Sequence, residues 1–262
     1  MTEGLDIRSA RSLAPAERAG LFTAAYEGYL LPFRIDEQQL AGMDDAFDID
    51  VDASLIAFRH GEAVGLGNLG VRDEDAWIGG VGVVPAARRS GVGESLMREL
   101  HDQARERGVR RVWLEVIFEN TGAFALYEKL GYRVVRDVEV WSLPAEDGPS
   151  EARDVAAADA HARIREQRAG REPWQRADGT LESYDDVRGL ETEDGVALFR
   201  AGNAVQLLQL AGEAKPLLTA LRRNGAVSVL NLPTDDPAAD ALRTLDANIV
   251  VRQHEMLLEL GD

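Results

Sequence analysis

The sequence predicts an α/β protein (an α+β mixed sheet) in which a mostly antiparallel sheet is flanked by helices, arranged as two domains. Strand-like runs joined by short polar connectors fill residues 54–83. A strand, a glycine-rich turn and an amphipathic helix follow at residues 81–107. A second alternation of strands and helices starts after a polar linker, and 262 residues suffice for two domains of ordinary size.

The first elements are helical. We expect a helix over residues 12–30, with Pro15 near its first turn, and a second over residues 36–43. Three strands should follow, at residues 54–59, 63–71 and 76–83. Their connectors are short and polar, as hairpins require, so the three strands are expected to be antiparallel neighbours.

The rest of the first half alternates helix and strand. A helix is expected over residues 93–107, ended by Gly108, followed by a strand over residues 111–117. Asn120 suits the N-cap of a helix through Leu130, and a last strand covers residues 132–141. We therefore place a first domain at residues 1–145.

Residues 145–150 form the clearest linker, because they are polar and contain glycine and proline. Beyond them, helices are expected at 155–167, 213–222 and 237–245, and strands at 197–200, 204–210, 226–230 and 248–258. When the sequence is aligned with itself at an offset of 115 residues, Val112 pairs with Val227 and Leu114 with Val229. This match indicates either an internal duplication or a generic alternation, and we place a second domain at residues 151–262.

Composition limits the possible functions. The net charge is −17 and both halves are acidic, so neither half is suited to nucleic-acid phosphates. No uncharged apolar run of 18 residues occurs and no signal peptide is evident, so we expect a cytoplasmic protein without a membrane span. There is no cysteine, and the four histidines show no metal-ligand spacing, so no metal is expected.

The turn before the helix at residue 93 predicts an anion site. A helix that begins there directs free backbone N–H groups and the positive end of its dipole at one point, which suits a phosphate or diphosphate. Gly91 and Gly93 allow a ligand to approach the main chain. The turn lacks the Gly-Lys-Ser/Thr of a nucleotide-binding P-loop and the Gly-x-Gly-x-x-Gly of dinucleotide folds.

Two motifs together carry a family resemblance. The spacing Arg88-x-x-Gly91-x-Gly93 after a Val-x-Val strand resembles the acetyl-CoA loop of GNAT-superfamily N-acetyltransferases. A second block, from Leu114-Glu115-Val116 to Gly131-Tyr132, resembles the other hallmark of that family. The resemblance implies two GNAT-like domains, each with a splayed mixed sheet. The second domain lacks the loop motif, which implies a degenerate copy without a CoA site.

The resemblance also implies how acetyl-CoA binds. Pantetheine would pair with the strand at Val81, Gly82 and Val83, and the diphosphate would lie on the N–H groups of the following turn. The implied cofactor residues are Val81, Gly82, Val83, Arg88, Arg89, Ser90, Gly91, Val92, Gly93, Glu94 and Asn120. The alternative for the two arginines is a solvated loop surface, and for Asn120 a plain helix N-cap.

Two residues are implied in catalysis by direct attack of an amine on the thioester. Tyr127 would protonate the departing thiolate as general acid, and Glu115 is the possible general base. A carboxylate inside the apolar strand at residues 112–117 is costly to bury without a reason. The alternatives are a tyrosine that only packs its helix, and a glutamate that lies at an edge or only hydrogen-bonds the substrate.

The sequence defines the acceptor pocket less closely than the acetyl-CoA site. Tyr26, Tyr29 and Phe33 lie where the family usually builds one wall of the acceptor pocket, and a small-molecule or peptidic amine is expected. A run of five aspartates at residues 44–52 would attract a polycation, or would only be a solvated loop. The second function considered is an acyl-CoA-binding pseudoenzyme that acts through its second domain. The sequence predicts no particular oligomeric state.

Overall fold

The computed structural model describes residues 4–29, 33–202 and 204–261. The chain divides into two compact units. Unit 1 contains the chain up to Val135 together with residues 255–262, and unit 2 runs from Arg136 to His254. Each unit is described by itself.

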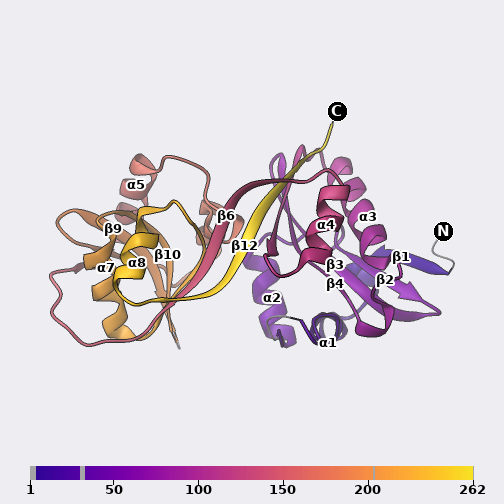
Figure 1. Cartoon of the computed structure of the whole chain (residues 1–262), viewed down its shortest axis with the longest axis horizontal. Coiled ribbons are helices and arrows are strands. Elements are labelled where there is room, and N and C mark those ends of the chain that lie inside the picture. Colours follow the sequence, from indigo (N-terminus) through magenta and orange to yellow (C-terminus); the bar gives the residue numbers. More distant parts are fainter. Residues whose placement is uncertain (1–3, 30–32, 203, 262) are drawn as a thin grey trace. The chain divides into compact units, whose positions relative to one another are not determined.

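Unit 1 is built on a mixed sheet (Figure 1). Its strands are β1 (Leu5–Ser9), β2 (Leu55–Arg59), β3 (Glu62–Arg72), β4 (Asp75–Val83), β5 (Arg111–Ile117) and the end of β12 (Asn248–Glu259). The pairs from β1 to β4 are antiparallel, which confirms the predicted hairpins, whereas β4 and β5 are parallel.

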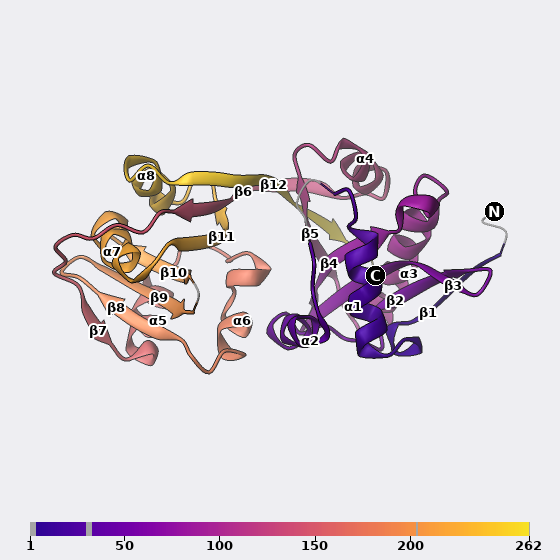
Figure 2. The same cartoon turned by 90° about the horizontal axis from the view of Figure 1, so that it is seen from below.

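Helices cover both faces of this sheet (Figure 2). On one face, α3 (Val92–Glu106) and α4 (Thr121–Lys129) pack over a core that includes Leu96, Leu100 and Leu114. On the other face, α1 (Pro15–Ala25) and α2 (Glu37–Ala46) cover Ile56 and Leu66. Apolar positions three and four residues apart on α3 explain why this helix lies flat on the sheet.

Unit 2 follows the same plan. Its sheet contains β6 (Arg133–Leu143), β7 (Arg153–Val155), β8 (Arg188–Glu191), β9 (Gly195–Ala201), β10 (Val205–Gly212) and β11 (Val227–Pro233). Its helices are α5 (Ala157–Gln167), α6 (Asp178–Glu182), α7 (Ala214–Leu221) and α8 (Pro237–Thr244). Helices α7 and α8 pack on one face, and α5 and α6 on the other. The two domains with mixed sheets flanked by helices therefore agree with the predicted fold class.

Several elements differ from the predictions. The sequence analysis missed β1, β7, β8 and α6, which are short, and apart from α6 they are strands of three to five residues. The first helix is α1, which is shorter than predicted, and the predicted end at Leu30 lies outside the described residues. The strands and helices between residues 55 and 130 lie within two or three residues of their predicted positions.

The unit boundaries differ from the linker at residues 145–150. Strand β6 runs from Arg133 to Leu143 without a break, and most of it belongs to unit 2. The last residues of the chain belong to unit 1, where Met256 and Leu260 are buried in its core. Composition cannot show this, because a linker signal records where the chain is polar and not which core each flanking strand enters.

Candidate functional site

Strands β4 and β5 run together at their amino ends and then part. Their parallel pairing ends at Trp77 and Trp113, although β4 continues to Val83 and β5 to Ile117. On its other side, β4 stays paired with β3 as far as Val83. Within the described residues, β4 therefore has a free main-chain edge that faces an opening in the sheet.

The free edge presents the main-chain groups of Val81 and Val83. The N–H of Val84 donates to the Val64 carbonyl of β3 at 3.0 Å. Because bonded and non-bonded positions alternate in an antiparallel pair, the groups of Val81 and Val83 are directed away from β3. An amide-bearing chain can add to such an edge as a further strand.

Two glycines form an irregularity on β4. The register with β3 shifts between Gly67 and Leu69, so Gly79 and Gly80 lie opposite Asn68 alone. A Cβ at Gly79 would lie 2.5 Å from the Trp77 ring, and one at Gly80, where φ is +129°, would lie 2.5 Å from the Tyr26 hydroxyl. Glycine is thus required at both positions of this bulge, which lies at the opening.

The start of α3 is left uncapped. Gly91 is the N-cap, with φ 84°, and no side chain accepts from the first N–H groups of the helix. A Cβ on Gly93 would meet only Val83, at 3.9 Å. The N–H groups of residues 92–94 have no acceptor within the helix, so this end can receive an anion at close range. The side chain of Val92 itself is buried in the core.

The residues of the loop have different contacts. The Arg88 guanidinium donates to three main-chain carbonyls, those of Val83, Ala25 and Glu27, at 2.6 to 3.1 Å. It therefore fastens the end of α1 to β4 in this structure. Arg89 is exposed and has φ 59°. The Ser90 hydroxyl donates to the Ala87 carbonyl at 2.6 Å and accepts from Arg59 at 3.2 Å.

Glu94 would oppose an anion at the start of α3, but its charge is balanced. Its carboxylate pairs with Lys129 of α4 at 2.7 Å and with Arg98 at 2.8 Å. These two cations, with Lys129 the stronger, hold the pKa of Glu94 below its ordinary value. The carboxylate is therefore engaged along the helix flank and away from the uncapped end.

Asn120 has two contacts. Its carbonyl oxygen accepts from the Ala123 N–H at 3.2 Å and so caps α4, as predicted. Its amide nitrogen donates to the Tyr29 hydroxyl at 3.1 Å. The second contact, which the sequence did not predict, joins α4 to the residues after α1.

Three phenols gather near the opening. The Tyr26 and Tyr29 rings are edge to face with centroids 5.2 Å apart. Burial raises the pKa of Tyr26 and Tyr127 well above the ordinary value, and Tyr127 and Tyr29 are close enough to raise the Tyr26 value further. Burial also raises the pKa of Tyr29, against the opposing hydrogen bond from Asn120. All three hydroxyls therefore keep their protons at neutral pH.

Glu115 is held by a residue that the sequence analysis missed. The indole Nε1 of Trp77 donates to a Glu115 carboxylate oxygen at 2.8 Å, from β4 to β5. Trp77 is 6% exposed, covers Gly79 and lies edge to face with Phe47. The sequence places Trp77 and Glu115 on two predicted strands, but no register was predicted between those strands, so this contact was not foreseen.

The predicted acceptor wall is an aromatic cluster. Tyr26 stacks on Phe22 with centroids 4.7 Å apart, and Phe33 meets Tyr26 edge to face at 5.3 Å. Phe33 is 40% exposed, so this cluster has an open apolar face.

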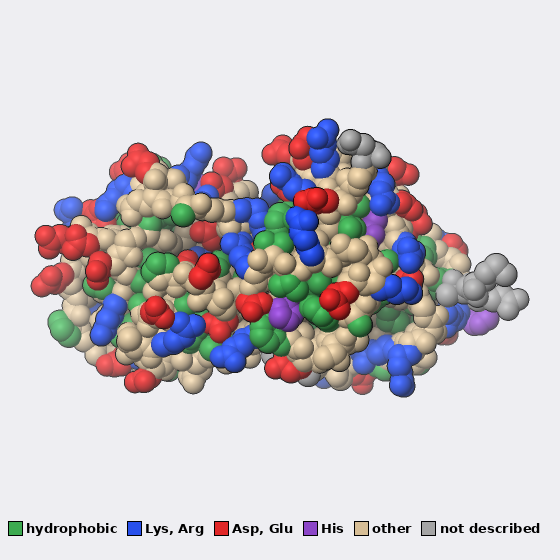
Figure 3. All heavy atoms as spheres, turned by 45° about the horizontal axis from the view of Figure 1, so that its top comes forward, with side chains coloured by type: hydrophobic (Ala, Val, Ile, Leu, Met, Phe, Trp, Pro, Cys, Tyr) green, Lys and Arg blue, Asp and Glu red, His purple; other side chains and the backbone are tan. Residues whose placement is uncertain are grey.

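Four of the five aspartates at residues 44–52, in α2 and the loop after it, are each paired with an arginine. Asp44 pairs with Arg18 at 3.0 Å, and Asp48, Asp50 and Asp52 pair with Arg72, Arg107 and Arg11. Acidic and basic side chains are interspersed over the face of each unit seen in Figure 3. The pairing favours the alternative in which this acidic run stabilises its own loop rather than attracting a polycation.

The described residues contain neither a metal-binding cluster nor a membrane-spanning helix. No group of three histidine or carboxylate side chains in this part of the chain is arranged to hold a metal ion. Among the same residues, no helix is long and apolar enough to cross a membrane.

The comparisons with known proteins agree on one family. The model of the acetyltransferase (GNAT) family matches residues 22–132. Ribosomal protein bS18-alanine N-acetyltransferase of Escherichia coli is 41% identical over 59 residues, which are 22% of this chain and 40% of that protein. Streptothricin acetyltransferase of Streptomyces lavendulae is 44% identical over 50 residues, or 19% of this chain and 26% of that protein. The chain thus spans less than half the length of these relatives.

Two solved structures extend the likeness to nearly the whole chain. A GCN5-related N-acetyltransferase from Sphaerobacter thermophilus has a TM-score of 0.77 at 17% identity, covering 98% of this chain and 96% of that one. A tandem GNAT protein from the clavulanic acid biosynthesis pathway has a TM-score of 0.68 at 14% identity, with coverage of 98% and 99%. These structures support the fold of both units. In sequence, the match to the acetyltransferase (GNAT) family covers residues 22–132 of this chain.

Proposed function

We propose that unit 1 transfers an acetyl group from acetyl-CoA to a primary amine of a small molecule or peptide. The opening between β4 and β5, beside the uncapped start of α3, carries this proposal. It combines a free strand edge for the amides of pantetheine with free N–H groups for the diphosphate. Relatives named as acetyltransferases of a ribosomal-protein alanine and of streptothricin support an amine acceptor.

The residues present fit this donor. Gly93 leaves open space where a phosphate would approach, and the Gly91 N-cap position offers no competing side chain. In this proposal, the main-chain groups of Val81 and Val83, with Gly82 between them, pair with the pantetheine arm, and residues 89–94 surround the diphosphate. Arg89 supplies charge there, whereas Arg88 acts mainly by holding the loop to α1. The Asn120 amide nitrogen has a second N–H besides the one that it donates to Tyr29, and in this proposal the second N–H donates to pantetheine.

Tyr127 and Glu115 divide the proton transfers. The Glu115 carboxylate takes a proton from the substrate ammonium, directly or through a water, and the neutral amine attacks the thioester carbonyl while N–H groups of β4 stabilise the oxyanion. The Tyr127 hydroxyl, which burial keeps protonated, then donates its proton to the thiolate as the C–S bond breaks, and the second proton of the former ammonium nitrogen returns to the tyrosinate. No covalent intermediate on the protein is required, in agreement with the absence of cysteine from the sequence.

Substitution Tyr127→Phe tests this mechanism. The change removes the hydroxyl and keeps the ring that packs on Tyr132 with centroids 5.8 Å apart. We expect turnover to fall by roughly 10² to 10⁴, as the loss of a general acid typically gives, with unchanged CoA affinity. The measurement is thiol release from acetyl-CoA across a panel of small amines and peptides, with calorimetry for CoA.

Two outcomes would contradict the proposal. Equal turnover of Tyr127→Phe and the wild type would remove Tyr127 from its role. CoA binding by the wild type without thiol release from any amine would instead favour the acyl-CoA-binding pseudoenzyme.

We also propose that unit 2, the degenerate GNAT-like half, has no CoA site. Its helix α7 begins after Gly212-Glu213, without the Arg-x-x-Gly-x-Gly spacing. A Cβ at Gly212 would lie 2.1 Å from the Asp194 carbonyl, so this turn is tightly closed. Acidic residues at the N-caps of α7 and α8 would repel a diphosphate at either helix.

A further inference from the structure

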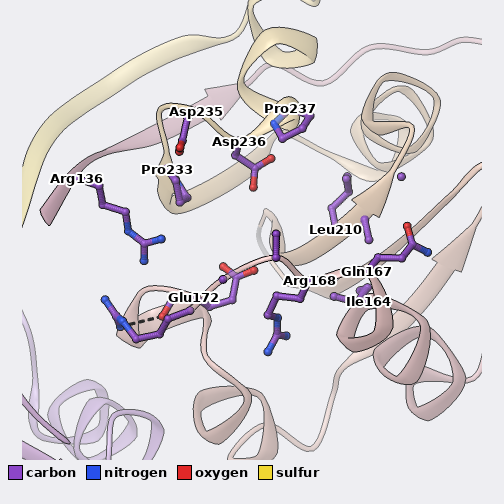
Figure 4. Close-up of a pocket in the computed structure, with 15 residues that line it drawn as sticks. Arg136, Ile164, Gln167, Arg168, Glu172, Leu210, Pro233, Asp235, Asp236 and Pro237 are labelled. Carbon is purple, nitrogen blue, oxygen red and sulfur yellow. Dashed lines mark hydrogen bonds between the residues drawn. The ribbon is translucent and has the colours of Figure 1, made fainter.

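Unit 2 contains a cavity of about 480 Å³ that the proposed function of unit 1 does not use. Four segments of this unit line it: the start of β6, the end of α5 with the loop to Glu172, the end of β10, and residues from Pro233 at the end of β11 to Pro237. Figure 4 shows Asp235 and Asp236 on one side of the cavity facing Glu172 on the other. A volume of this size is typical of a ligand pocket.

The cavity lies where the sheet of unit 2 opens. Strands β10 and β11 are parallel partners only from Val205 and Val227 to Leu207 and Val229. Beyond that point, β10 stays paired with β9 as far as Gly212. Within the described residues, β10 thus has a free edge, as β4 has in unit 1.

The free edge of β10 presents main-chain groups to the cavity. The N–H of Glu213 donates to the Asp194 carbonyl at 2.9 Å, on the β9 side. Because hydrogen-bonded and non-bonded positions alternate along an antiparallel pair, the main-chain groups of Leu210 and Gly212 are directed away from β9. Both residues line the cavity, so an extended chain with amides can pair with them there.

The carboxylates around the cavity favour the positively charged amino end of such a chain. Asp236 Oδ1 accepts from the Ala238 N–H at 2.8 Å, which fixes the carboxylate at the start of α8. Burial is the main cause that raises the pKa of Asp236. The Ala238 N–H and the Arg176 guanidinium oppose this rise, and the nearby Glu172 and Asp235 carboxylates add to it. A cation bound between these groups would relieve this repulsion and desolvation.

Three arginines, Arg136, Arg168 and Arg171, also line the cavity, and Arg168 and Arg171 are engaged by the protein itself. Arg171 donates to the Glu172 carbonyl at 2.9 Å. Arg168 is engaged by Asp178 and by the Gln209 side chain, both at 2.8 Å. The neighbouring Arg176, which is 2% exposed, donates to Glu172 at 3.0 Å. Asp235 and Asp236, at the carboxyl end of the open sheet, are the groups best placed to bind a ligand charge.

We propose that unit 2 binds the free amino end of an extended peptide, whose main chain pairs with β10 and whose ammonium group is held by Asp235 and Asp236. The strand edge recognises the amides, and the carboxylates distinguish a free terminus from a blocked one. This site is separate from the acetyl transfer proposed for unit 1, and its test contains no acetyl-CoA.

The test is titration of the intact chain with tetraalanine amide, followed by calorimetry and by backbone NMR shifts. We expect binding, with the largest shifts at Leu210, Gly212 and residues 235–237. N-acetylated tetraalanine amide and the peptide methylated on its second amide nitrogen should each bind at least about tenfold more weakly, since each loses a charge-assisted or main-chain hydrogen bond.

Matched variants test the carboxylates. The double change Asp235→Asn and Asp236→Asn removes both charges, and asparagine at 236 still caps α8. It should weaken tetraalanine amide at least about tenfold. Asp240→Asn removes an exposed charge on α8 that pairs with Arg243 outside the cavity, and it should change nothing.

The proposal is overturned if tetraalanine amide does not bind, if its acetylated form binds equally well, or if the shifts arise only in unit 1. The last result would assign the peptide to the acceptor site of unit 1 alone. A protein that binds the peptide in unit 2 and shows no acetyl transfer would uphold this proposal while the proposed function fails.

Discussion

At the scale of single residues, several polar side chains around the opening in unit 1 are oriented by a neighbour. Trp77 holds Glu115, Asn120 holds Tyr29, and Arg88 is held by carbonyls at the ends of β4 and α1. Such contacts fix side chains before a substrate arrives, which is what proton transfer requires. They also identify Trp77 as a positioning residue for the proposed base.

Substitution Trp77→Phe should move the acid limb of the pH–rate profile to higher pH. The indole N–H stabilises the charged form of the Glu115 carboxylate by a hydrogen bond that phenylalanine cannot donate. Phenylalanine keeps an aromatic ring against Phe47. The measurement is kcat as a function of pH with one saturating amine.

Trp113→Phe is the matched control. Its indole donates to the Asp75 carboxylate at 2.8 Å, and Trp113 is about as buried as Trp77. The control should leave the acid limb in place. If both variants shift it equally, or neither does, Trp77 does not act through Glu115.

The sequence predicted the identity of the proposed site residues but not their contacts. Motif spacing indicates Tyr127, Glu115 and the residues of the turn. Hydrogen bonds such as Trp77 to Glu115 or Asn120 to Tyr29 join residues 38 and 91 positions apart, so they depend on register and helix placement. A local sequence pattern does not determine strand register or helix placement.

At the scale of elements, α3 connects the uncapped helix end to a buried polar pair. His101 of α3 is 5% exposed, and its Nε2 lies 2.9 Å from the Tyr132 hydroxyl. Burial, with Arg105 adding to it, lowers the pKa of His101 to about 4. The Tyr132 ring in turn packs against Tyr127, so this pair supports the helix that carries the proposed acid.

Substitution His101→Gln should reduce the loss of stability in mild acid. His101 is neutral in the folded protein but takes up a proton near its ordinary pKa when unfolded, so stability falls as pH drops from about 6.5 towards 4. Between pH 7 and pH 5 the wild type should lose about 1 to 2 kcal/mol more than His101→Gln. Urea unfolding at the two pH values measures this difference, and equal losses would refute it.

The sequence predicted the elements of the acetyl-CoA region better than those at the edges. Between residues 55 and 130, hydrophobic periodicity, Gly108 and Asn120 fix both the type and the ends of each element. Strands β7 and β8 contain only three and four residues, too few to show an alternating pattern. The parting of β4 and β5 was expected only from the family resemblance.

At the scale of the whole molecule, the end of the chain completes the core of unit 1. Met256 is fully buried among residues of α3 and β5. A segment ending at residue 145, where the sequence predicted a boundary, would therefore lack part of this core. The predicted linker does not mark the boundary of unit 1, because the end of the last strand belongs to the core of this unit.

Substitution Met256→Ala should destabilise unit 1 by about 2 to 5 kcal/mol, as buried large-to-small changes do. Val250→Ala lies on the same strand β12 but changes a side chain that is 51% exposed, and it should cost little. The measurement is thermal unfolding with and without CoA. If the two variants behave alike, the chain end does not belong to the core of unit 1.

The central claim concerns the main chain at the start of α3, and calorimetric titration of CoA into Gly93→Ala tests it most directly. In the protein itself the new Cβ would only touch Val83, at an ordinary contact distance of 3.9 Å. Gly122→Ala is the matched control at the same position of α4, where a Cβ has open space. We predict one CoA bound per chain, roughly tenfold weaker in Gly93→Ala and unchanged in Gly122→Ala, with melting temperatures preserved. Equal CoA affinity in Gly93→Ala and the wild type would contradict the account.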